Sequence, residues 1–317
     1  MPASDLGQPT LGIFAATVAA AVGAWPLVGC GDKNEVDGAA VDAMRDALRG
    51  ADWGGIVVIG EGEKDEAPML YNGEKIGGGQ PLDWDIAVDP IDGTALAAEG
   101  VPGAVSVMAA AERGGMMAAP EVFYMQKIVS GPEGVGLLDL DFEPEKNIKL
   151  LAEALDKPVS QLNVAVIDKP RNENLIERVQ ACGANWVRFA EGDVAMAVAA
   201  AAEGSEVDLL LGVGGNPEGV VTACAVQVLG GFMQGRLMPL TPDEMSVALA
   251  AGYDVERKYE LEELAKGERF VFALTGITDG ILAQGVREHE GYLELQCFLL
   301  DSRLGEPRLL EVRVPTE

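Results

Sequence analysis

The fold of this chain is decided by residues 84–94, Trp-Asp-Ile-Ala-Val-Asp-Pro-Ile-Asp-Gly-Thr. The apolar run predicts a short buried strand that ends at Asp89, because the next residue, Pro90, has no N–H group for a sheet. Asp92, a flexible glycine and a hydroxyl follow. Two carboxylates across a tight turn can share a hard cation, and a hydroxyl beside them can hold a water. An acidic surface turn is the alternative, but the full pattern favours metal-assisted attack of water on a phosphate ester.

The composition limits the class of protein. The chain has 317 residues, 48% of them hydrophobic, with 40 glycines, which indicates a compact α/β enzyme large enough for two domains. A net charge of −28 argues against binding to nucleic acid or to an anionic membrane. The same charge repels a phosphorylated substrate, so divalent cations and local Lys or Arg side chains must reverse the field in a phosphatase site.

Cysteine and histidine usage bears on compartment and metal chemistry. Cys30, Cys182, Cys224 and Cys297 are far apart and form no Cys-x-x-Cys pair, which favours reduced thiols and a cytoplasmic location. His289 is the single histidine, so His-rich zinc or di-iron sites cannot be built. Any metal must be held by oxygen ligands, which is typical of Mg²⁺ or Mn²⁺.

Residues 6–31 carry no charge and are rich in Ala, Val and Gly. Residues 27–30, Leu-Val-Gly-Cys, are similar to the cleavage box of a bacterial lipoprotein signal, but Asp5 stands where a positive segment is required. Gly23 and Pro26 interrupt the run, which argues against a membrane-spanning helix. We therefore expect a buried N-terminal helix and no membrane association.

Two further acidic segments precede the central stretch. Residues 31–38 lead into a helix of about three turns, with Asp37 expected in its first turn, where N-capping is the alternative to a functional role. Residues 55–59 are mostly β-branched and predict a buried strand, which the acidic loop 60–66 follows. Because ligands gather beyond the carboxyl ends of strands in open α/β sheets, we expect loops 60–66 and 89–92 to meet at one metal site.

The second half alternates between predicted strands and helices, a rhythm that favours a mostly parallel sheet. We place a domain boundary at Lys157-Pro158, which divides the chain into an N-terminal metal-binding phosphatase domain, 1–157, and a C-terminal α/β substrate-binding domain, 158–317. The glycine-rich residues 212–220 open a helix and suit an anion at its N-terminus, a plain tight turn being the alternative. The predicted strands are 103–111, 121–130, 162–168, 185–189, 207–212 and 269–274. Predicted helices lie near 149–155 and 173–181, and a further predicted helix ends near residue 202.

The Asp-Pro-Ile-Asp-Gly-Thr motif resembles the metal-dependent, lithium-sensitive phosphatase superfamily, which includes inositol monophosphatases and fructose-1,6-bisphosphatases. From about residue 31 to 280 the chain is similar to class II, GlpX-type fructose-1,6-bisphosphatases. The blocks that carry this resemblance are Gly-Asp-Lys-Asn…Asp-Gly, Val-Ile-Gly-Glu-Gly-Glu-Lys-Asp-Glu-Ala-Pro-Met-Leu-Tyr, Lys-Pro-Arg, Gly-Asp-Val-Ala and Gly-Gly-Asn-Pro-Glu-Gly-Val. The resemblance implies an α/β, layered αβαβα sandwich, with a mixed sheet in the N-terminal half and a mostly parallel sheet in the C-terminal half. It also implies Mn²⁺ or Mg²⁺ as cofactor and a homo-oligomer, a dimer or a tetramer.

The resemblance further implies the site residues. The metal ligands would be Asp37, Glu61, Asp89, Asp92 and Glu218. The substrate, a sugar bisphosphate, would be bound by Asp92, Gly93, Thr94, Tyr124, Lys169, Pro170, Arg171, Glu191, Gly192, Asp193 and Gly215. The catalytic candidates would be Thr94, which orients a water, Asp65 for water activation and Lys33 for phosphate binding.

The implied activity is hydrolysis of the 1-phosphate of fructose-1,6-bisphosphate, with sedoheptulose-1,7-bisphosphate as a second substrate in some photosynthetic members. An inositol-monophosphatase-like phosphomonoesterase and a catalytically silent sugar-phosphate-binding protein are the alternatives. Asp92 stands where the family often has Glu, and Glu191 where others have Asp. The N-terminal helix lacks the charges of relatives, and the tail beyond about residue 281 is not recognisably familial.

Overall fold

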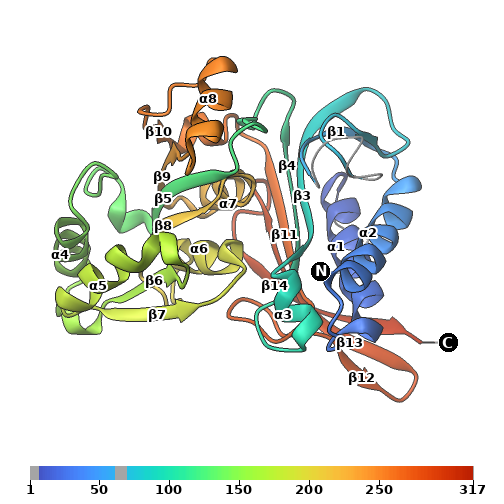
Figure 1. The fold of residues 1–317 in the computed structure, drawn as a ribbon. Helices are drawn as coiled ribbons and strands as arrows, with labels where there is room; N and C mark the ends of the chain where they lie inside the picture. The colour runs from blue at the N-terminus through green and yellow to red at the C-terminus, as the bar shows by residue number, and fades with distance from the viewer. Residues whose placement is uncertain (1–6, 61–69, 317) are drawn as a thin grey trace. The chain divides into compact units, whose positions relative to one another are not determined.

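The computed structural model describes residues 7–60 and 70–316, and the chain forms two compact units (Figure 1). Unit 1 comprises Met1–Ala118 and Lys266–Glu317, and unit 2 comprises Ala119–Ala265. The expected boundary at Lys157-Pro158 differs from this division, since it lies inside unit 2. The reason is that the last strands of the chain return to pair with the first sheet, and a linear scan of composition does not detect such a return.

Unit 1 is built on a mixed eight-stranded sheet of order β12-β13-β11-β4-β3-β1-β2, with β14 beside β13. Among the described strands of this unit, β1 and β3 form the one parallel pair. The strands are β1 (Gly54–Ile59), β2 (Lys75–Ile76), β3 (Leu82–Asp92), β4 (Val105–Glu112), β11 (Phe270–Gly276), β12 (Arg287–His289), β13 (Tyr292–Asp301) and β14 (Arg308–Pro315). The helices are α1 (Thr10–Ala24), α2 (Lys33–Arg49) and α3 (Thr94–Glu99).

Strand β3 is central in this sheet, and its buried run from Trp84 to Val88 is the one expected from the sequence. The prediction that the strand ends at Asp89 is wrong, because β3 continues through Pro90 to Asp92. The pairing with β4 is interrupted by a register shift between Asp89 and Asp92. An irregularity of this kind is where a sheet tolerates a proline, since no ladder hydrogen bond is required of it.

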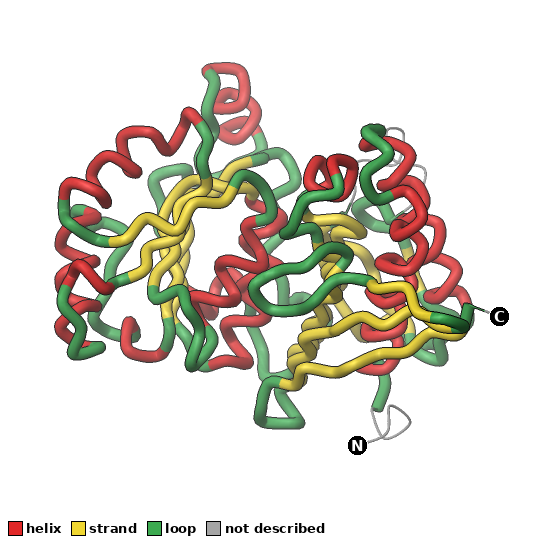
Figure 2. Tube along the Cα trace, turned by 90° about the horizontal axis from the view of Figure 1, so that it is seen from below, coloured by secondary structure: helices red, strands yellow, loops and turns green. Residues whose placement is uncertain are grey.

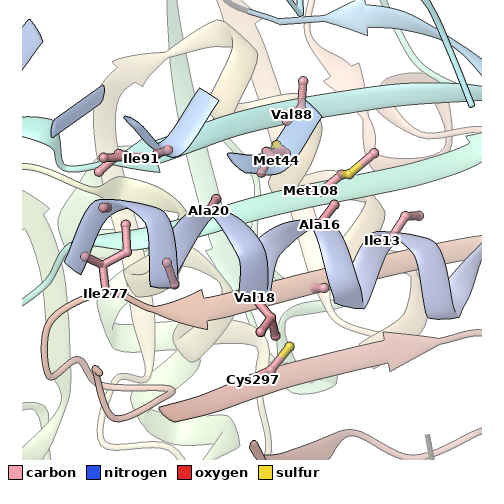
Figure 3. Close-up of a cluster of buried hydrophobic side chains, with 14 of the residues drawn as sticks. Ile13, Ala16, Val18, Ala20, Met44, Val88, Ile91, Met108, Ile277 and Cys297 are labelled. Carbon is pink, nitrogen blue, oxygen red and sulfur yellow. The ribbon is translucent and has the colours of Figure 1, made fainter. Parts of the chain in front are cut away.

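Helix α1 is buried between α2 and the sheet, as the uncharged sequence predicted. Figure 3 shows Ile13, Ala16 and Ala20 of α1 facing the strands that carry Val88 and Met108. Small side chains allow the neighbouring elements to approach closely. The stretch Thr10–Leu27 has a mean hydropathy of 1.6 and could cross a membrane by length and composition, but half of it is buried inside the protein. These residues therefore behave as a core helix of unit 1.

Unit 2 contains a six-stranded sheet of order β10-β9-β5-β8-β6-β7. The expectation of a mostly parallel sheet is wrong, because β5 pairs antiparallel with β8 and β9, β9 pairs antiparallel with β10, and two pairs, β6 with β7 and with β8, are parallel. Strand β5 enters between β8 and β9 from an earlier part of the chain, so the β-α-β rhythm describes only one side of the sheet. The strands are β5 (Tyr124–Ser130), β6 (Asn163–Ile167), β7 (Asn185–Phe189), β8 (Leu209–Gly215), β9 (Phe232–Leu237) and β10 (Tyr259–Glu260).

Helices cover both faces of the unit 2 sheet (Figure 2). Helices α4 (Pro144–Ala154) and α5 (Glu173–Ala181) share a core with Ile128 of β5 and Leu211 of β8. Helices α6 (Asp193–Ala201) and α7 (Asn216–Leu229) pack on the other face, where Lys127 of β5 reaches α6. Two short helices, α8 (Pro242–Ala250) and α9 (Leu261–Leu264), complete the unit. Both units are thus α/β with mixed sheets, which confirms the predicted fold class at that level.

Candidate active site

The end of β3 carries two of the expected carboxylates to the start of α3. Asp89 is half-buried, and its Oδ1 accepts a hydrogen bond from the N–H of Ile91 at 2.9 Å. Asp92 closes the strand with 5% of its surface exposed. Gly93 has a φ of +87°, a left-handed conformation that lets the strand turn directly into a helix. The Thr94 hydroxyl donates to the Ile91 carbonyl at 2.9 Å. The junction thus fixes two carboxylates and a hydroxyl within one turn of chain.

Helix α2 carries a third expected carboxylate, but the helix begins earlier than predicted. Asp32 is its N-cap, because the Asp32 Oδ1 accepts from the N–H groups of Asn34 and Glu35 at 2.9 and 3.3 Å. Asp37 therefore lies in the second turn, so both the first-turn prediction and the N-cap alternative are wrong. Burial raises the pKa of the Asp37 carboxyl above its usual range. A half-buried carboxylate of this kind gains from a nearby cation.

The segment before α2 is tied to α3. The N–H groups of Gly29 and Gly31 donate to the carbonyls of Ala97 and Ala98 at 2.9 and 2.8 Å. Lys33 follows at once, exposed on the first turn of α2. Since α3 starts at the β3 junction, these bonds hold the N-terminal turns of α2 in the same region of unit 1 as the two aspartates.

Glu61 and Asp65 lie outside the described residues, so their predicted roles stay predictions. The strand that leads to them, β1, runs parallel to β3, with Ile59 opposite Ala87. Parallel neighbours present their carboxyl ends at the same edge of a sheet. Ile59, the last residue of β1, therefore ends its strand at the same edge of the sheet as Asp89.

Unit 2 holds a buried lysine between two expected site residues. Lys127 is 1% exposed, and its Nζ donates to Oδ2 of Asp193 at 2.7 Å and to the carbonyl of Gly215 at 2.8 Å. Asp193 is the first residue of α6 and follows Gly192, whose φ is +76°. Gly215 ends β8 and precedes α7. The ammonium group of Lys127 thus donates hydrogen bonds at the N-terminal ends of both α6 and α7.

Glu218 lies in the first turn of α7, where the helix dipole favours a carboxylate. Its Oε2 is buried and has no hydrogen-bond partner among the described residues. Burial, followed by the negative charge of Asp193, raises the pKa of the Glu218 carboxyl, while Lys127 and Arg171 lower it. The Glu218 carboxylate folds back over Gly215, where a Cβ would overlap it. A buried oxygen without a partner is a place where a cation fits.

The other face of β5 carries Tyr124 and, stacked on its ring, Arg171, with 4.8 Å between the guanidinium carbon and the ring centroid. The Arg171 Nε donates to the carbonyl of Val213 at 2.8 Å. The neighbouring Asn172 also binds Val213, accepting from its N–H at 2.9 Å and donating to its carbonyl at 3.0 Å. The turn Pro170–Asn172 is thereby anchored to the end of β8, which fixes the direction of the guanidinium.

Lys169 and Glu191 complete the expected substrate residues of unit 2. Their side chains form an ion pair at 3.5 Å, and both are partly exposed. Three of the sequence-predicted residues of unit 2 fall into two groups on opposite faces of β5. Tyr124 and Arg171 lie on one face, and Asp193 is reached by Lys127 from the other.

A cavity of 410 Å³ lies within unit 2 beside the first of these groups. Three guanidinium groups, those of Arg171, Arg178 and Arg236, line it. Arg178 and Arg236 form ion pairs with carboxylates of the segment 141–145, so their charge is already neutralised. Among the described residues, Arg171 is the guanidinium of this cavity that has no ion pair with a carboxylate, which keeps its charge available for a ligand.

Sequence reasoning missed Lys127 and Asn172. The signal for Lys127 was present, because a single lysine in the predicted apolar strand 121–130 must be buried and must find acceptors. No comparable signal existed for Asn172, whose role depends on the distant Val213.

The four cysteines are free thiols: Cys224 and Cys297 are buried, Cys182 is half-buried and Cys30 is exposed. Burial raises the pKa of Cys224 to about 12 and that of Cys297 to about 11.

The donor set suits a hard divalent cation. Within residues 7–60 and 70–316 no group of three or more His, Cys, Asp or Glu side chains lies close enough to hold a metal ion. One expected ligand, Glu61, falls outside these ranges. The buried oxygen of Glu218 and the raised pKa of Asp37 nevertheless both fit carboxylates whose charge is compensated by a cation.

An α/β protein whose strand ends carry paired aspartates and a hydroxyl, together with a guanidinium available to an anion, has the features of a phosphatase. The family model for bacterial fructose-1,6-bisphosphatase, glpX-encoded, matches residues 8–313. The chain is 40% identical over 301 residues to fructose-1,6-bisphosphatase 2 class 2 of Escherichia coli (strain K12), covering 91% of this chain and 94% of the relative. It is 37% identical over 318 residues to the D-fructose 1,6-bisphosphatase class 2/sedoheptulose 1,7-bisphosphatase of Synechococcus elongatus, covering 92% of each. The chain therefore belongs to the GlpX-type, class II fructose-1,6-bisphosphatase family.

Family membership confirms the resemblance predicted from the sequence and implies a metal-dependent phosphatase. The match is longer than expected. It includes the uncharged N-terminal helix and reaches residue 313, so the prediction that the tail beyond about residue 281 lies outside the family is wrong.

Proposed function

We propose that this protein hydrolyses the 1-phosphate of fructose-1,6-bisphosphate to fructose-6-phosphate and phosphate. The observation that carries the proposal is the β3–α3 junction, where Asp89 and Asp92 stand beside the Thr94 hydroxyl. Sedoheptulose-1,7-bisphosphate is a second candidate substrate, supported by the name of the Synechococcus relative.

The proposed cofactor is Mn²⁺ or Mg²⁺. When bound, such ions lower the pKa of water and neutralise phosphoryl oxygens. The proposed ligands all offer carboxylate oxygen and are Asp37, Glu61, Asp89, Asp92 and Glu218. Asp92 is one methylene shorter than the glutamate frequent in the family, so its carboxylate reaches less far from the end of β3.

Thr94 is proposed to orient the attacking water. Because its hydroxyl proton is donated to the Ile91 carbonyl, the Thr94 oxygen can only accept a hydrogen bond from a water. A water that donates one hydrogen bond to Thr94 keeps its lone pairs free, and we propose that it attacks a phosphoryl group bound beside Asp92 and Gly93. Asp65 is the proposed acceptor of the proton of that water, and Lys33 is proposed to bind a phosphoryl oxygen.

The distant phosphate is proposed to bind Arg171, whose Nε is engaged by Val213 and whose terminal nitrogens form a fork suited to phosphate. Tyr124 supports the guanidinium by stacking. The remaining proposed substrate contacts are Lys169, Pro170, Glu191, Gly192, Asp193 and Gly215.

The finer architecture and the cellular setting belong to the same proposal. We propose the layered αβαβα sandwich of this phosphatase superfamily, a homo-oligomer (a dimer or a tetramer) and a cytoplasmic location. The sequence-based domain roles, metal binding for the N-terminal part and substrate binding for the C-terminal part, are proposed for units 1 and 2.

The test is phosphate release from fructose-1,6-bisphosphate, sedoheptulose-1,7-bisphosphate and inositol monophosphate with Mn²⁺ or Mg²⁺, using Asp89→Ala as the blank. We expect metal-dependent release from the sugar bisphosphates that is abolished in the variant, with the far-UV circular dichroism spectrum preserved. Release from inositol monophosphate alone would assign the protein to the sister family. Tight binding of the sugar bisphosphate without phosphate release would identify a silent binding protein. An Asp89→Ala variant that keeps most of its activity would contradict the ligand assignment.

A further inference from the structure

The buried ammonium group of Lys127 has no direct part in the proposed reaction. It lies in the middle of β5 with 1% of its surface exposed. Burying a charged group carries a large desolvation cost, and replacing a buried ion pair by well-packed apolar side chains is often neutral or stabilising. Stability alone therefore does not account for a lysine at this position.

The bonds of Lys127 connect two helix starts. One donor goes to Oδ2 of Asp193, the first residue of α6, at 2.7 Å. A second goes to the carbonyl of Gly215 at 2.8 Å, and Gly215 is the residue before α7. Glu218 lies in the first turn of that helix. A single ammonium group thus connects the segment that carries Asp193 with the segment that carries Glu218.

The glycines at the end of β8 make this connection tight. At Gly214 a Cβ would overlap the Asp193 carboxylate and would lie 3.2 Å from the Lys127 Nζ. At Gly215 a Cβ would overlap the Glu218 carboxylate. The two carboxylates therefore pack against consecutive residues of one strand, and a shift of that strand end moves both.

We propose that Lys127 is a positioning residue, which fixes the Asp193 and Glu218 carboxylates relative to each other and so sets the affinity for the metal ion and for the sugar. The inference rests on the proposed function, in which Glu218 is a metal ligand and Asp193 contacts substrate. Lys127 forms its hydrogen bonds with Asp193 and the Gly215 carbonyl, and its charge also acts on the nearby Glu218 carboxyl. A lysine suits the role because its ammonium carries three donors on a narrow stem, whereas an apolar side chain of similar length offers none.

The test measures Mn²⁺ binding to the full chain directly, by titration calorimetry or by the electron paramagnetic resonance signal of free Mn²⁺. We expect Lys127→Met to weaken Mn²⁺ binding by about tenfold or more, the range seen when groups that orient metal ligands are lost. We also expect a higher KM for fructose-1,6-bisphosphate, because Asp193 loses its partner.

Two controls separate positioning from loss of stability. Lys157→Met removes another lysine of unit 2, whose Nζ pairs with Asp208 at 2.6 Å at the surface, and should leave Mn²⁺ binding unchanged. Ile148→Ala opens a cavity in the α4 core, where Ile148 is fully buried, and should lower Tm while Mn²⁺ affinity stays at the wild-type value.

If Lys127→Met does not fold, the double variant Lys127→Met/Asp193→Asn removes both charges of this ion pair, so neither member is left as an unpaired buried ion. We expect this variant to fold and still to bind Mn²⁺ about tenfold more weakly, because the Gly215 carbonyl has lost its donor. Mn²⁺ affinity within twofold of wild type in either variant would overturn the positioning role, even with a lowered Tm. A wild-type chain that neither binds Mn²⁺ nor releases phosphate would instead overturn the proposed function, and this inference with it.

Discussion

Each unit contains a deeply buried carboxylate, and the two carboxylates differ in the hydrogen-bond donors and charges around them. Asp85, in the middle of β3, is 2% exposed, and its Oδ2 accepts hydrogen bonds from three consecutive N–H groups, of residues 114–116, at 2.7, 3.0 and 3.4 Å. The other oxygen, Oδ1, is likewise buried without a hydrogen-bond partner among the described residues, but it forms an ion pair with Arg113. Glu218, at the start of α7, has a buried Oε2 without a hydrogen-bond partner among the described residues, and burial raises its pKa.

The difference separates a structural carboxylate from one that suits a ligand. The turn after β4 supplies Asp85 with donors, so its charge is compensated by the fold itself. Glu218 is compensated only in part, by its helix terminus and by the positive charges of Lys127 and Arg171. Such a group lowers the stability of the fold, and the compensation expected here is metal binding.

The strongest test of the comparison is Glu218→Gln. We expect kcat with Mn²⁺ to fall by about 10³-fold, because a metal ligand stabilises charge in the transition state by several kcal/mol. The measurement is phosphate release from fructose-1,6-bisphosphate. Glu153→Gln, the same change at an exposed position of α4, serves as the control and should keep full activity. A Glu218→Gln variant with activity near wild type would remove Glu218 from the ligand set.

Asp85→Asn should lower the stability of the fold and leave the activity of the folded protein unchanged. The amide can no longer accept as strongly from the backbone donors, and Arg113 loses its partner, so we expect the free energy of unfolding to fall by about 3 kcal/mol. Urea unfolding measures this loss. Turnover per folded molecule, assayed well below Tm, should remain close to wild type. An unchanged unfolding midpoint together with lost turnover would mean that Asp85 belongs to the site.

Gly215→Ala tests whether the Glu218 carboxylate needs its present position. The added Cβ would overlap that carboxylate, so the side chain must move. We expect activity to fall by about 10–100-fold, the effect of a small misplacement of a catalytic group. The control is Gly50→Ala at the end of α2, where φ is −97° and a Cβ meets nothing within 4 Å. Equal activities of the Gly215→Ala and Gly50→Ala variants would show that activity does not depend on the present position of the Glu218 carboxylate.

The smallest expected effect is a pH dependence of the metal-free protein. Burial raises the pKa of Glu218 in the folded state above its value in the unfolded state. The folded state therefore binds this proton more tightly, and the free energy of unfolding decreases as pH rises through the folded-state pKa and the proton is lost. The glutamine side chain of the Glu218→Gln variant does not titrate. In EDTA, the Tm of this variant relative to wild type should therefore rise between pH 5 and pH 8, by about 2 °C for each kcal/mol. A constant difference in Tm across this range would contradict the assignment.

Much of the fold could be predicted because it depends on local patterns. The buried run of β3, the strands near 103–111 and 162–168, and the core helix α1 follow from apolar periodicity and from the absence of charge. Errors arose where a distant partner overrode a local rule. Pro90 stays in β3 because the pairing with β4 is irregular there, and Asp37 is not a cap because Asp32 caps α2.

In the candidate site, too, the part that depends on neighbouring residues could be predicted and the part that depends on distant partners could not. The motif that contains Asp89 and Asp92 could be recognised because its members are close in sequence, and the family prediction made from it is confirmed. The buried charge network of unit 2 could not be recognised as such. Lys127 is 66 residues from Asp193 and 88 from Gly215, so no periodicity connects them. The roles of both groups in catalysis stay predictions until the variants are measured.

The sequence by itself determined the α/β class, the family and the identity of the candidate carboxylates, because each is encoded by composition, period and short motifs. Only the tertiary structure decided that β5 is inserted between β8 and β9, that the chain returns to complete the first sheet, and that Asp85 has an ion pair and backbone donors while the charge of Glu218 is compensated only in part. The physical reason is that burial and hydrogen bonding depend on partners from distant parts of the chain, and these partners meet only when the sheets have formed.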